Sequence, residues 1–194
     1  MKHPMGIHKN RNIQTNYGNR GMDLEEEINL SNQYYLERDM AIIYKKPTPI
    51  TITKVDYPSR LEAVIKEAYF KIPSTTDYNG IYKGRYIDFE AKETTLKAFP
   101  LRNIHEHQIK HLDRITKHGG IGFLIVRFSK YNETFYLSYK TLKKFLSEEK
   151  RKSIPIEYFR EYGYKIKDTY QPRIDYLKIV DQYIRKESAF EKGN

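Results

Sequence analysis

The order of apolar and polar positions along the first third of the chain predicts one helix followed by short strands. Apolar residues three to four positions apart between Leu24 and Glu37 predict an amphipathic helix with an acidic first turn. Residues 41–44 are apolar enough for a short strand, and residues 50–55 alternate like another. The basic connector between them, residues 45–49, is stiffened by two prolines. Residues 61–70 fit a helix or a strand equally well.

The middle of the chain predicts two strands joined by a turn. Residues 75–92 contain an Asn-Gly pair and a Lys-Gly pair, both of which are turn signals, between runs that suit strands. The period of two in a strand places Asp88, Glu90 and Lys92 on one face and apolar residues on the other. Three charged side chains on one face of an otherwise apolar strand mark this segment as a candidate site.

Beyond this segment the pattern returns to helices and strands. A helix is expected over residues 103–117, ended by two glycines. A mostly apolar strand over residues 121–128 and a hairpin partner over residues 133–137 follow. The remainder predicts two or three helical segments, the last over residues 174–186. Together these elements predict an α/β fold.

Length and composition favour one compact unit that binds a polyanion. The chain has 194 residues, with 35 Lys and Arg against 25 Asp and Glu, which gives a net charge of +10. Such an excess suits nucleic acid, and the 18 Tyr and nine Phe offer stacking surfaces as well as core residues. Residues 1–21 carry basic residues without an acid, so we expect a flexible basic arm, with a solubilising tail as the alternative. Residues 22–194 are then a single domain.

Two absences in the sequence bear on the class of protein. Without cysteine, the chain has no disulfide, zinc-thiolate site or thiol nucleophile, which suits a reducing compartment. The longest apolar stretch, residues 121–126, is too short to span a bilayer, and the first six residues lack the apolar core of a signal peptide. We therefore expect a cytoplasmic location and no membrane partner.

The candidate chemistry lies at Asp77 and, thirteen residues later, at Glu90-Ala91-Lys92. Cutting a phosphodiester requires carboxylates to hold a divalent cation, and one acid from each of two adjacent strands is able to do this. An ammonium group two residues beyond Glu90 lies on the same face, where it stabilises negative charge. The alternative is a cross-strand salt bridge, which an acid-x-Lys pattern alone favours. The apolar strand around Glu90 and Lys92 shifts the balance towards a functional role.

Several longer sequence motifs resemble those of a known family. They are Asn19-Arg20-Gly21-Met22, Lys45-Lys46-Pro47-Thr48-Pro49, Ser74-Thr75-Thr76-Asp77-Tyr78-Asn79-Gly80, Tyr86-Ile87-Asp88-Phe89-Glu90-Ala91-Lys92-Glu93-Thr94, His105-Glu106-His107-Gln108 and Tyr170-Gln171-Pro172-Arg173-Ile174-Asp175-Tyr176. In these words, and in their order from about Arg20 to Asp181, the chain resembles the RecU Holliday-junction resolvases.

The resemblance implies a homodimeric, magnesium-dependent endonuclease, for which Mn²⁺ is a substitute cofactor. It implies a restriction-endonuclease-like core, in which helices flank a central mixed β-sheet, with a projecting stalk at about residues 45–72. Enzymes of this family make paired symmetric nicks in four-way DNA junctions during homologous recombination and repair. A recombinase and a branch-migration helicase are the protein partners that such a role suggests.

Roles for individual residues follow from the same resemblance. Thr75, Asp77, Glu90 and Gln108 match the positions around the metal, and Lys92 matches the transition-state stabiliser. Because Thr75 lies two residues before Asp77, we expect it on the same strand face. For Gln108 the alternative is an ordinary surface glutamine. His107 and His111 lie four residues apart on the expected helix, a zinc-site spacing, but no third ligand accompanies them and we predict no zinc.

The resemblance also supplies candidates outside the carboxylate pair. Glu25 matches an acid of the wider nuclease superfamily and counts as a fourth catalytic candidate, and Arg20 matches an arginine tied to junction handling. The expected DNA-contacting residues of the stalk are Lys45, Lys46, Arg60, Tyr69 and Phe70. A stiff, basic projection suits the open centre of a junction, whereas the alternative is an ordinary basic hairpin turn.

Two other functions compete with junction resolution. A non-catalytic junction-binding or recombination scaffold protein keeps the fold but needs none of Asp77, Glu90 and Lys92, all of which are present. A sequence-specific restriction enzyme shares the chemistry but needs a recognition domain that the chain does not show. The sequence therefore favours a structure-selective endonuclease.

Overall fold

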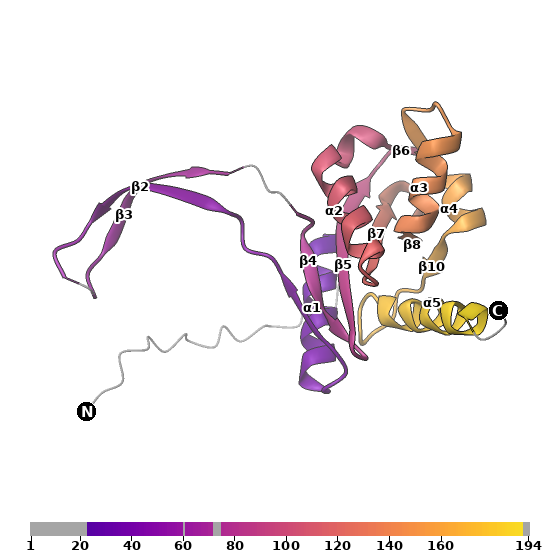
Figure 1. Ribbon diagram of the computed structural model, residues 1–194, viewed down its shortest axis with the longest axis horizontal. Helices are drawn as coiled ribbons and strands as arrows, with labels where there is room; N and C mark the ends of the chain where they lie inside the picture. The colour runs from indigo at the N-terminus through magenta and orange to yellow at the C-terminus, as the bar shows by residue number, and fades with distance from the viewer. Residues whose placement is uncertain (1–22, 60, 72–74, 192–194) are drawn as a thin grey trace.

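The computed structural model describes residues 23–59, 61–71 and 75–191, and its body is built on one mixed sheet. The strand order is β1-β4-β5-β7-β8-β10, in which β5 and β7 are parallel and all other neighbours antiparallel. The strands are β1 (Ile42–Lys45), β4 (Tyr78–Tyr82), β5 (Arg85–Thr94), β7 (Ile121–Phe128), β8 (Glu133–Ser138) and β10 (Tyr164–Ile166). Helices flank this sheet in the body of the molecule (Figure 1).

Two apolar clusters show which helices cover which face of the sheet. On one face, α1 (Leu24–Glu37) and α5 (Tyr176–Glu191) pack on residues of β4, β5 and β7. On the other face, α2 (Glu106–Lys117), α3 (Tyr139–Glu148) and α4 (Ile156–Tyr162) pack on β7 and β8. Smaller elements complete this side: β6 (Ala98–Pro100) pairs with β9 (Ser153–Pro155), and η1 (Leu101–Asn103) and η2 (Ser129–Tyr131) are short 3₁₀ turns. The predicted α/β class, with a mixed sheet between helices, is confirmed.

Helix α1 begins where its sequence favours an N-terminus. The Asp23 carboxylate accepts a hydrogen bond from the Glu26 N–H at 2.7 Å, which satisfies one of the free donors of the first turn. The acidic residues of that turn also oppose the positive end of the helix dipole. The observed bounds, Leu24–Glu37, are those that the apolar spacing predicts.

Strand β5 separates its side chains between the two faces as the alternation predicts. Phe89 packs between Tyr78 and Phe123, with ring centroids 4.8 and 4.7 Å apart and nearly parallel planes. Tyr176 of α5 closes this stack at 5.1 Å from Phe89. Asp88, Glu90 and Lys92 therefore point to the opposite face, the one that α2 covers.

The turn between β4 and β5 uses only one of the two predicted turn signals. Lys83 and Gly84 both have positive φ, 48° and 72°, which is the backbone of a type I′ two-residue hairpin. Gly80 instead lies inside β4, opposite Ile43 of β1. A Cβ atom at Gly80 would lie 2.0 Å from the carbonyl oxygen of Ile42, so glycine is needed there for close strand approach.

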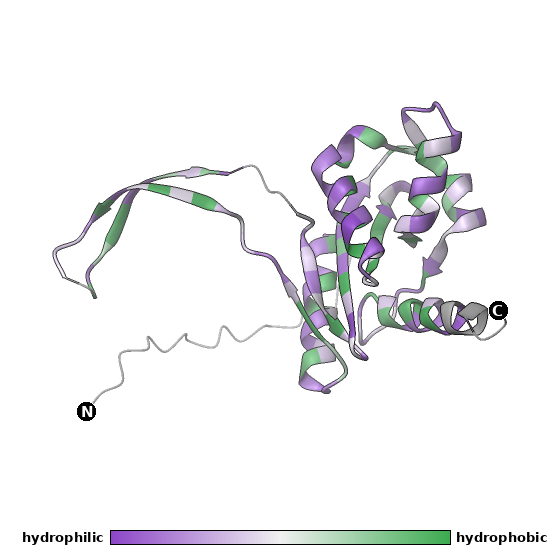
Figure 2. Ribbon diagram, in the orientation of Figure 1, coloured by the Kyte–Doolittle hydropathy of each residue, from purple (hydrophilic) through white to green (hydrophobic). Residues whose placement is uncertain are grey.

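A long two-stranded hairpin projects from the body (Figure 1). It consists of β2 (Ile50–Asp56) and β3 (Val64–Phe70), which pair antiparallel. The ambiguous residues 61–70 thus contain a strand, and the predicted projecting stalk is present. Every residue of both strands is exposed, including apolar ones that colour the hairpin green (Figure 2). The domain boundaries at residues 21 and 22 remain a prediction, because residues 1–22 lie outside the described part.

Among the described residues, no helix combines the length and apolar character that a membrane crossing requires.

Candidate active site

Asp77 and Glu90 lie side by side because β4 and β5 are hydrogen-bonded neighbours. Tyr78 pairs with Phe89 in the register, so the residue before β4 lies next to Glu90. The main-chain N–H of Asp77 donates to Oε2 of Glu90 at 3.0 Å. The predicted proximity of the two acids is therefore present, although Asp77 precedes β4 rather than lying within it.

Lys92 brings a positive charge to this pair. Its Nζ atom lies 3.7 Å from Oδ2 of Asp77 and contacts the Glu90 carboxylate directly. Lys92 and Asp77 remain partly exposed, whereas the Glu90 side chain is fully buried. These contacts are those of the salt-bridge alternative, and they also place the ammonium group beside both acids, where the predicted role of Lys92 needs it.

Burial sets the electrostatics of Glu90. Desolvation raises its pKa to about 7, Lys92 opposes that rise, and the negative charge of Asp77 adds to it. Burial together with the nearby carboxylates of Glu25 and Asp77 also raises the pKa of Tyr78. The hydroxyl group of Tyr78 thus lies in an acidic neighbourhood that includes the fourth catalytic candidate, Glu25.

The donor set fits a magnesium ion better than a structural metal. In the parts of the chain that the structure covers, no group of three or more His, Cys, Asp or Glu side chains is placed to hold a cation. Asp77 and Glu90 supply two hard carboxylates from adjacent strands. Mg²⁺ is commonly bound through one or two carboxylates while it keeps several waters, so this pair suits it.

Thr75 and Gln108, the other two residues predicted around the metal, both make hydrogen bonds within the protein. We expected Thr75 on the same strand face as Asp77, but it lies in the segment before β4, where its hydroxyl donates to the Thr76 carbonyl at 3.4 Å. Gln108 is buried on α2, and its carboxamide oxygen accepts the His105 N–H at 2.9 Å. That bond caps the helix, which begins after His105 and later than predicted. Their metal-binding roles stay predictions.

Glu25 and Lys45 contact each other between α1 and β1. Lys46 turns inward instead: its Nζ lies 2.8 Å from Oδ2 of the buried Asp88. Lys45, a predicted DNA contact, therefore already has an acidic partner in Glu25. Lys46, the second predicted contact, has a side chain that is only 19% exposed.

The remaining DNA-contact candidates fall on the stalk or outside the described residues. Tyr69 and Phe70 are exposed on β3, and the Tyr69 hydroxyl donates to Glu67 at 2.6 Å. Arg20 and Arg60 lie outside the described residues. Exposed aromatic rings on a projecting hairpin are placed to contact bases, which leaves the prediction for Tyr69 and Phe70 open to experiment.

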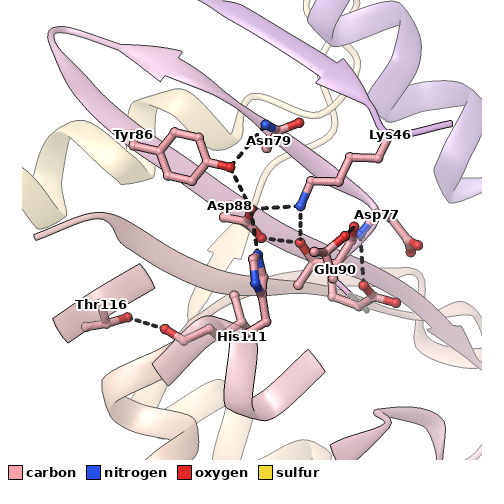
Figure 3. A network of polar contacts seen from close by, with 11 residues as sticks. Lys46, Asp77, Asn79, Tyr86, Asp88, Glu90, His111 and Thr116 are labelled. Atoms are coloured by element: carbon pink, nitrogen blue, oxygen red, sulfur yellow. Dashed lines mark hydrogen bonds and ion pairs between the residues drawn. The ribbon is translucent and has the colours of Figure 1, made fainter. Parts of the chain in front are cut away.

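Asp88 is a buried acid to which the sequence interpretation gave no role. It lies on the same face of β5 as Glu90, and Lys46, Tyr86 and His111 surround it (Figure 3). The Thr76 hydroxyl also donates to it. The alternation of β5 already placed Asp88 on the charged face, so the sequence contained one indication of its role. Its partners come from separate segments, so their convergence is visible only in the fold.

An open groove of about 380 Å³ begins at the carboxyl end of β5, just beyond Lys92. It is lined by Glu93, Thr94, Thr95, Leu96, Pro100, Arg102, Asn103 and Ser129. The lining combines hydroxyl and amide groups with one guanidinium group and the Glu93 carboxylate.

Comparisons with known proteins agree with the words quoted from the sequence. The family model RecU, described as Recombination protein U, matches residues 19–182. "Holliday junction resolvase RecU" from Geobacillus sp. (strain WCH70) is 55% identical over 176 residues, covering 89% of this chain and 88% of the relative. The protein of the same name from Ligilactobacillus salivarius is 57% identical over 181 residues, 92% and 84% of the two chains.

A third relative of that name, from Staphylococcus saprophyticus, is 53% identical over 185 residues, 93% of this chain and 89% of the relative. Among solved structures, Archaeoglobus fulgidus Hjc, a Holliday junction resolvase from an archaeal hyperthermophile, aligns with a TM-score of 0.41 and 9% identity. That alignment covers 71% of this chain and 94% of Hjc. On the family match and the three sequence relatives, the chain belongs to the RecU family.

Proposed function

We propose that this protein is a structure-selective endonuclease that resolves Holliday junctions by divalent-metal-dependent hydrolysis, with Mg²⁺ as the cofactor and Mn²⁺ as a substitute. The observation that carries the proposal is the convergence of Asp77, just before β4, with Glu90 and Lys92 of the neighbouring strand β5. Relatives more than half identical over most of their length bear the name Holliday junction resolvase, which supports the same activity.

The three residues divide the chemistry between them. Asp77 and Glu90 are the residues that would hold the metal, and the bound cation supplies a Lewis acid for the scissile phosphate. Lys92 stabilises the negative charge that develops as water attacks phosphorus and the P–O bond breaks. The N–H of Asp77 fixes the Glu90 carboxylate, so the two acids are already oriented before DNA binds.

Paired nicks in a junction require two copies of this site. A homodimer with two-fold symmetry presents two carboxylate pairs to strands that the junction's own symmetry relates. The net charge of +10 favours binding of phosphates, and the stalk is the element whose shape is able to tell a junction from a duplex. We further expect a cytoplasmic role alongside a recombinase or a branch-migration helicase.

The decisive experiment is a junction-cleavage gel with and without Mg²⁺, beside a linear duplex. Asp77→Asn and Glu90→Gln keep side-chain size but remove the charge that attracts the cation, so we expect junction binding to persist while cleavage fails. Lys110→Ala, which removes an exposed cation of α2 paired with Glu106, is the matched control and should cut normally. Wild-type rates in either acid variant would refute the site.

The same gel separates the proposal from its main rival. A non-catalytic scaffold binds the junction and leaves it intact at every Mg²⁺ concentration. Equal cleavage of linear duplex and junction would instead indicate a nuclease without structure selectivity. Sedimentation that shows only monomers while paired nicking continues would contradict the homodimer.

A further inference from the structure

Asp88 collects hydrogen-bond donors from four parts of the fold. Lys46 Nζ lies 2.8 Å, the Tyr86 hydroxyl 3.0 Å and His111 Nε2 3.1 Å from its Oδ2 atom, and the Thr76 hydroxyl donates to its Oδ1 atom. The Asp88 side chain is fully buried. Figure 3 shows Lys46, Tyr86 and His111 directed at this one carboxylate from different elements.

Two of these donors belong to the two ends of the stalk. Lys46 follows β1, where the chain leaves the body towards β2, and Thr76 precedes β4, where the chain has returned from β3. The Lys46 N–H donates to the Asp77 carbonyl at 2.7 Å, and Lys46 Nζ donates to the Thr76 hydroxyl at 3.1 Å. Both ends of the stalk are thus tied together, and Asp88 is their shared acceptor.

Asp77 depends on these ties because it lies outside the regular part of β4. Its own N–H binds Glu90, its carbonyl accepts from Lys46, and its neighbour Thr76 is held by Asp88. Each of these bonds limits where the Asp77 carboxylate can lie. Misplacement of a reacting group by about 1 Å costs up to about 10²-fold in rate, so the residues that hold this segment matter for the chemistry.

We propose that Asp88 is a positioning residue that fixes the base of the stalk to the carboxylate pair, and that Lys46 acts there as a strut rather than as a phosphate contact. The proposal rests on the proposed function, because it concerns the metal-binding geometry of Asp77. A buried ion pair is a poor way to gain stability, since desolvation offsets its attraction. Asp88 and Lys46 are therefore better explained by the fixed geometry that they impose.

Asparagine at position 88 keeps the size of the side chain but changes the hydrogen bonds that its two terminal atoms can make. A carboxylate accepts on both oxygens, whereas a carboxamide offers one accepting oxygen and one donating nitrogen. With its oxygen towards Lys46, Tyr86 and His111, the Asn carboxamide turns its nitrogen towards Thr76, whose hydroxyl can then accept but loses the oxygen to which it donates. The substitution also removes the negative charge that Lys46 faces. The substitution is isosteric, so it loosens the stalk base without opening a cavity.

The test measures Mg²⁺ binding to the DNA-free protein by calorimetry, and the Mg²⁺ dependence of single-turnover junction cleavage. For Asp88→Asn we expect roughly tenfold weaker Mg²⁺ binding and a matching rise in the Mg²⁺ needed for half-maximal rate, the scale typical when a residue that orients a ligand is lost. Backbone hydrogen exchange at Lys46, whose N–H binds Asp77, should also become faster.

The matched control is Arg127→Met, which breaks the contact between Glu27 and Arg127, two side chains that are each 11% exposed. It should lower stability while leaving the Mg²⁺ dependence unchanged. If Asp88→Asn folds poorly, the double variant Lys46→Met/Asp88→Asn removes both charges and should recover stability, because neither charge is then left unpaired. Its Mg²⁺ binding should stay weakened.

Unchanged Mg²⁺ binding in a folded Asp88→Asn protein, or recovery of wild-type Mg²⁺ dependence in the double variant, would overturn the positioning role. The proposed function fails on a different result, namely a wild-type protein that does not cleave junctions at any Mg²⁺ concentration.

Discussion

Gly80→Ala is expected to disturb the edge of the sheet on which the stalk is built. The new Cβ would lie 2.0 Å from the Ile42 carbonyl oxygen and 2.6 Å from the Ile43 Cα. Both are main-chain atoms, so no side-chain rotation relieves the contact. To reach an ordinary separation, β1 must withdraw from β4 by more than about 1 Å, which weakens the hydrogen bonds of that pair.

We expect this substitution to lower the free energy of unfolding by about 3 kcal/mol, the upper end of the usual cost of overpacking. For a chain of this length, that loss corresponds to a melting temperature roughly 6–12 °C lower. Because β1 ends at Lys45 and Lys46 follows it directly, the withdrawal should also slow junction cleavage at temperatures where the variant is still folded.

Urea denaturation is the appropriate assay, and Gly84→Ala is its control. No atom lies within 4 Å of a Cβ at Gly84, but its φ of +72° disfavours other residues. That substitution should cost only about 1–2 kcal/mol, the strain of a left-handed backbone. If Gly80→Ala proves no more destabilising than Gly84→Ala, then the close approach of β1 does not limit the residue at position 80.

Three further predictions follow from the contacts described. Lys92→Ala should lower the single-turnover rate on the order of 10²-fold with junction affinity nearly unchanged, whereas a large affinity loss at an unchanged rate would make Lys92 a phosphate anchor. Phe70→Ser, at a side chain 83% exposed, should weaken junction binding about tenfold and duplex binding less, as gel-shift titrations will show, and equal losses would contradict a stacking role. Lys117 and Lys143 donate to Asp113 and hold its pKa well below the usual range, so its stabilising effect is present above about pH 4, the pKa of an unfolded Asp, and is lost as the pH falls further. Asp113→Asn should therefore lower the melting temperature at pH 7, and its effect should shrink steadily as the pH falls from about 4 towards the lowered pKa; an effect that does not change with pH over this range would contradict the ion pairs.

Elements with strong local signals were predicted closely. Helix α1 has an N-cap acid and a regular apolar stripe, and β7 is an almost continuous apolar run, so both bounds match. The stalk strand β3 stayed ambiguous because neither of its faces is buried, and without burial there is no alternation to read. The start of α2 was placed too early, because residues 101–103 form a 3₁₀ turn before the helix.

The candidate site was predictable to the extent that its parts are close in the sequence. Asp77, Glu90 and Lys92 belong to one hairpin, so spacing and alternation bring them together. The inward direction of Lys46 and the convergence on Asp88 depend on contacts that bridge 30 or more residues between β1, the segment before β4 and strand β5. Local patterns contain no information on such pairings, which arise only when the sheet assembles.

The two ends of the stalk enter and leave the body at adjacent points, joined by the hydrogen bond between Lys46 and Asp77. A segment inserted between two such adjacent points can be exchanged. A tight turn, a longer hairpin or a foreign loop can join the same two ends without any change in the strand order of the sheet. We therefore expect insertions and deletions in the stalk to change the DNA shape that it is proposed to engage while leaving the carboxylate pair in place. That separation gives both evolution and protein engineering a route to new substrate shapes on one catalytic body.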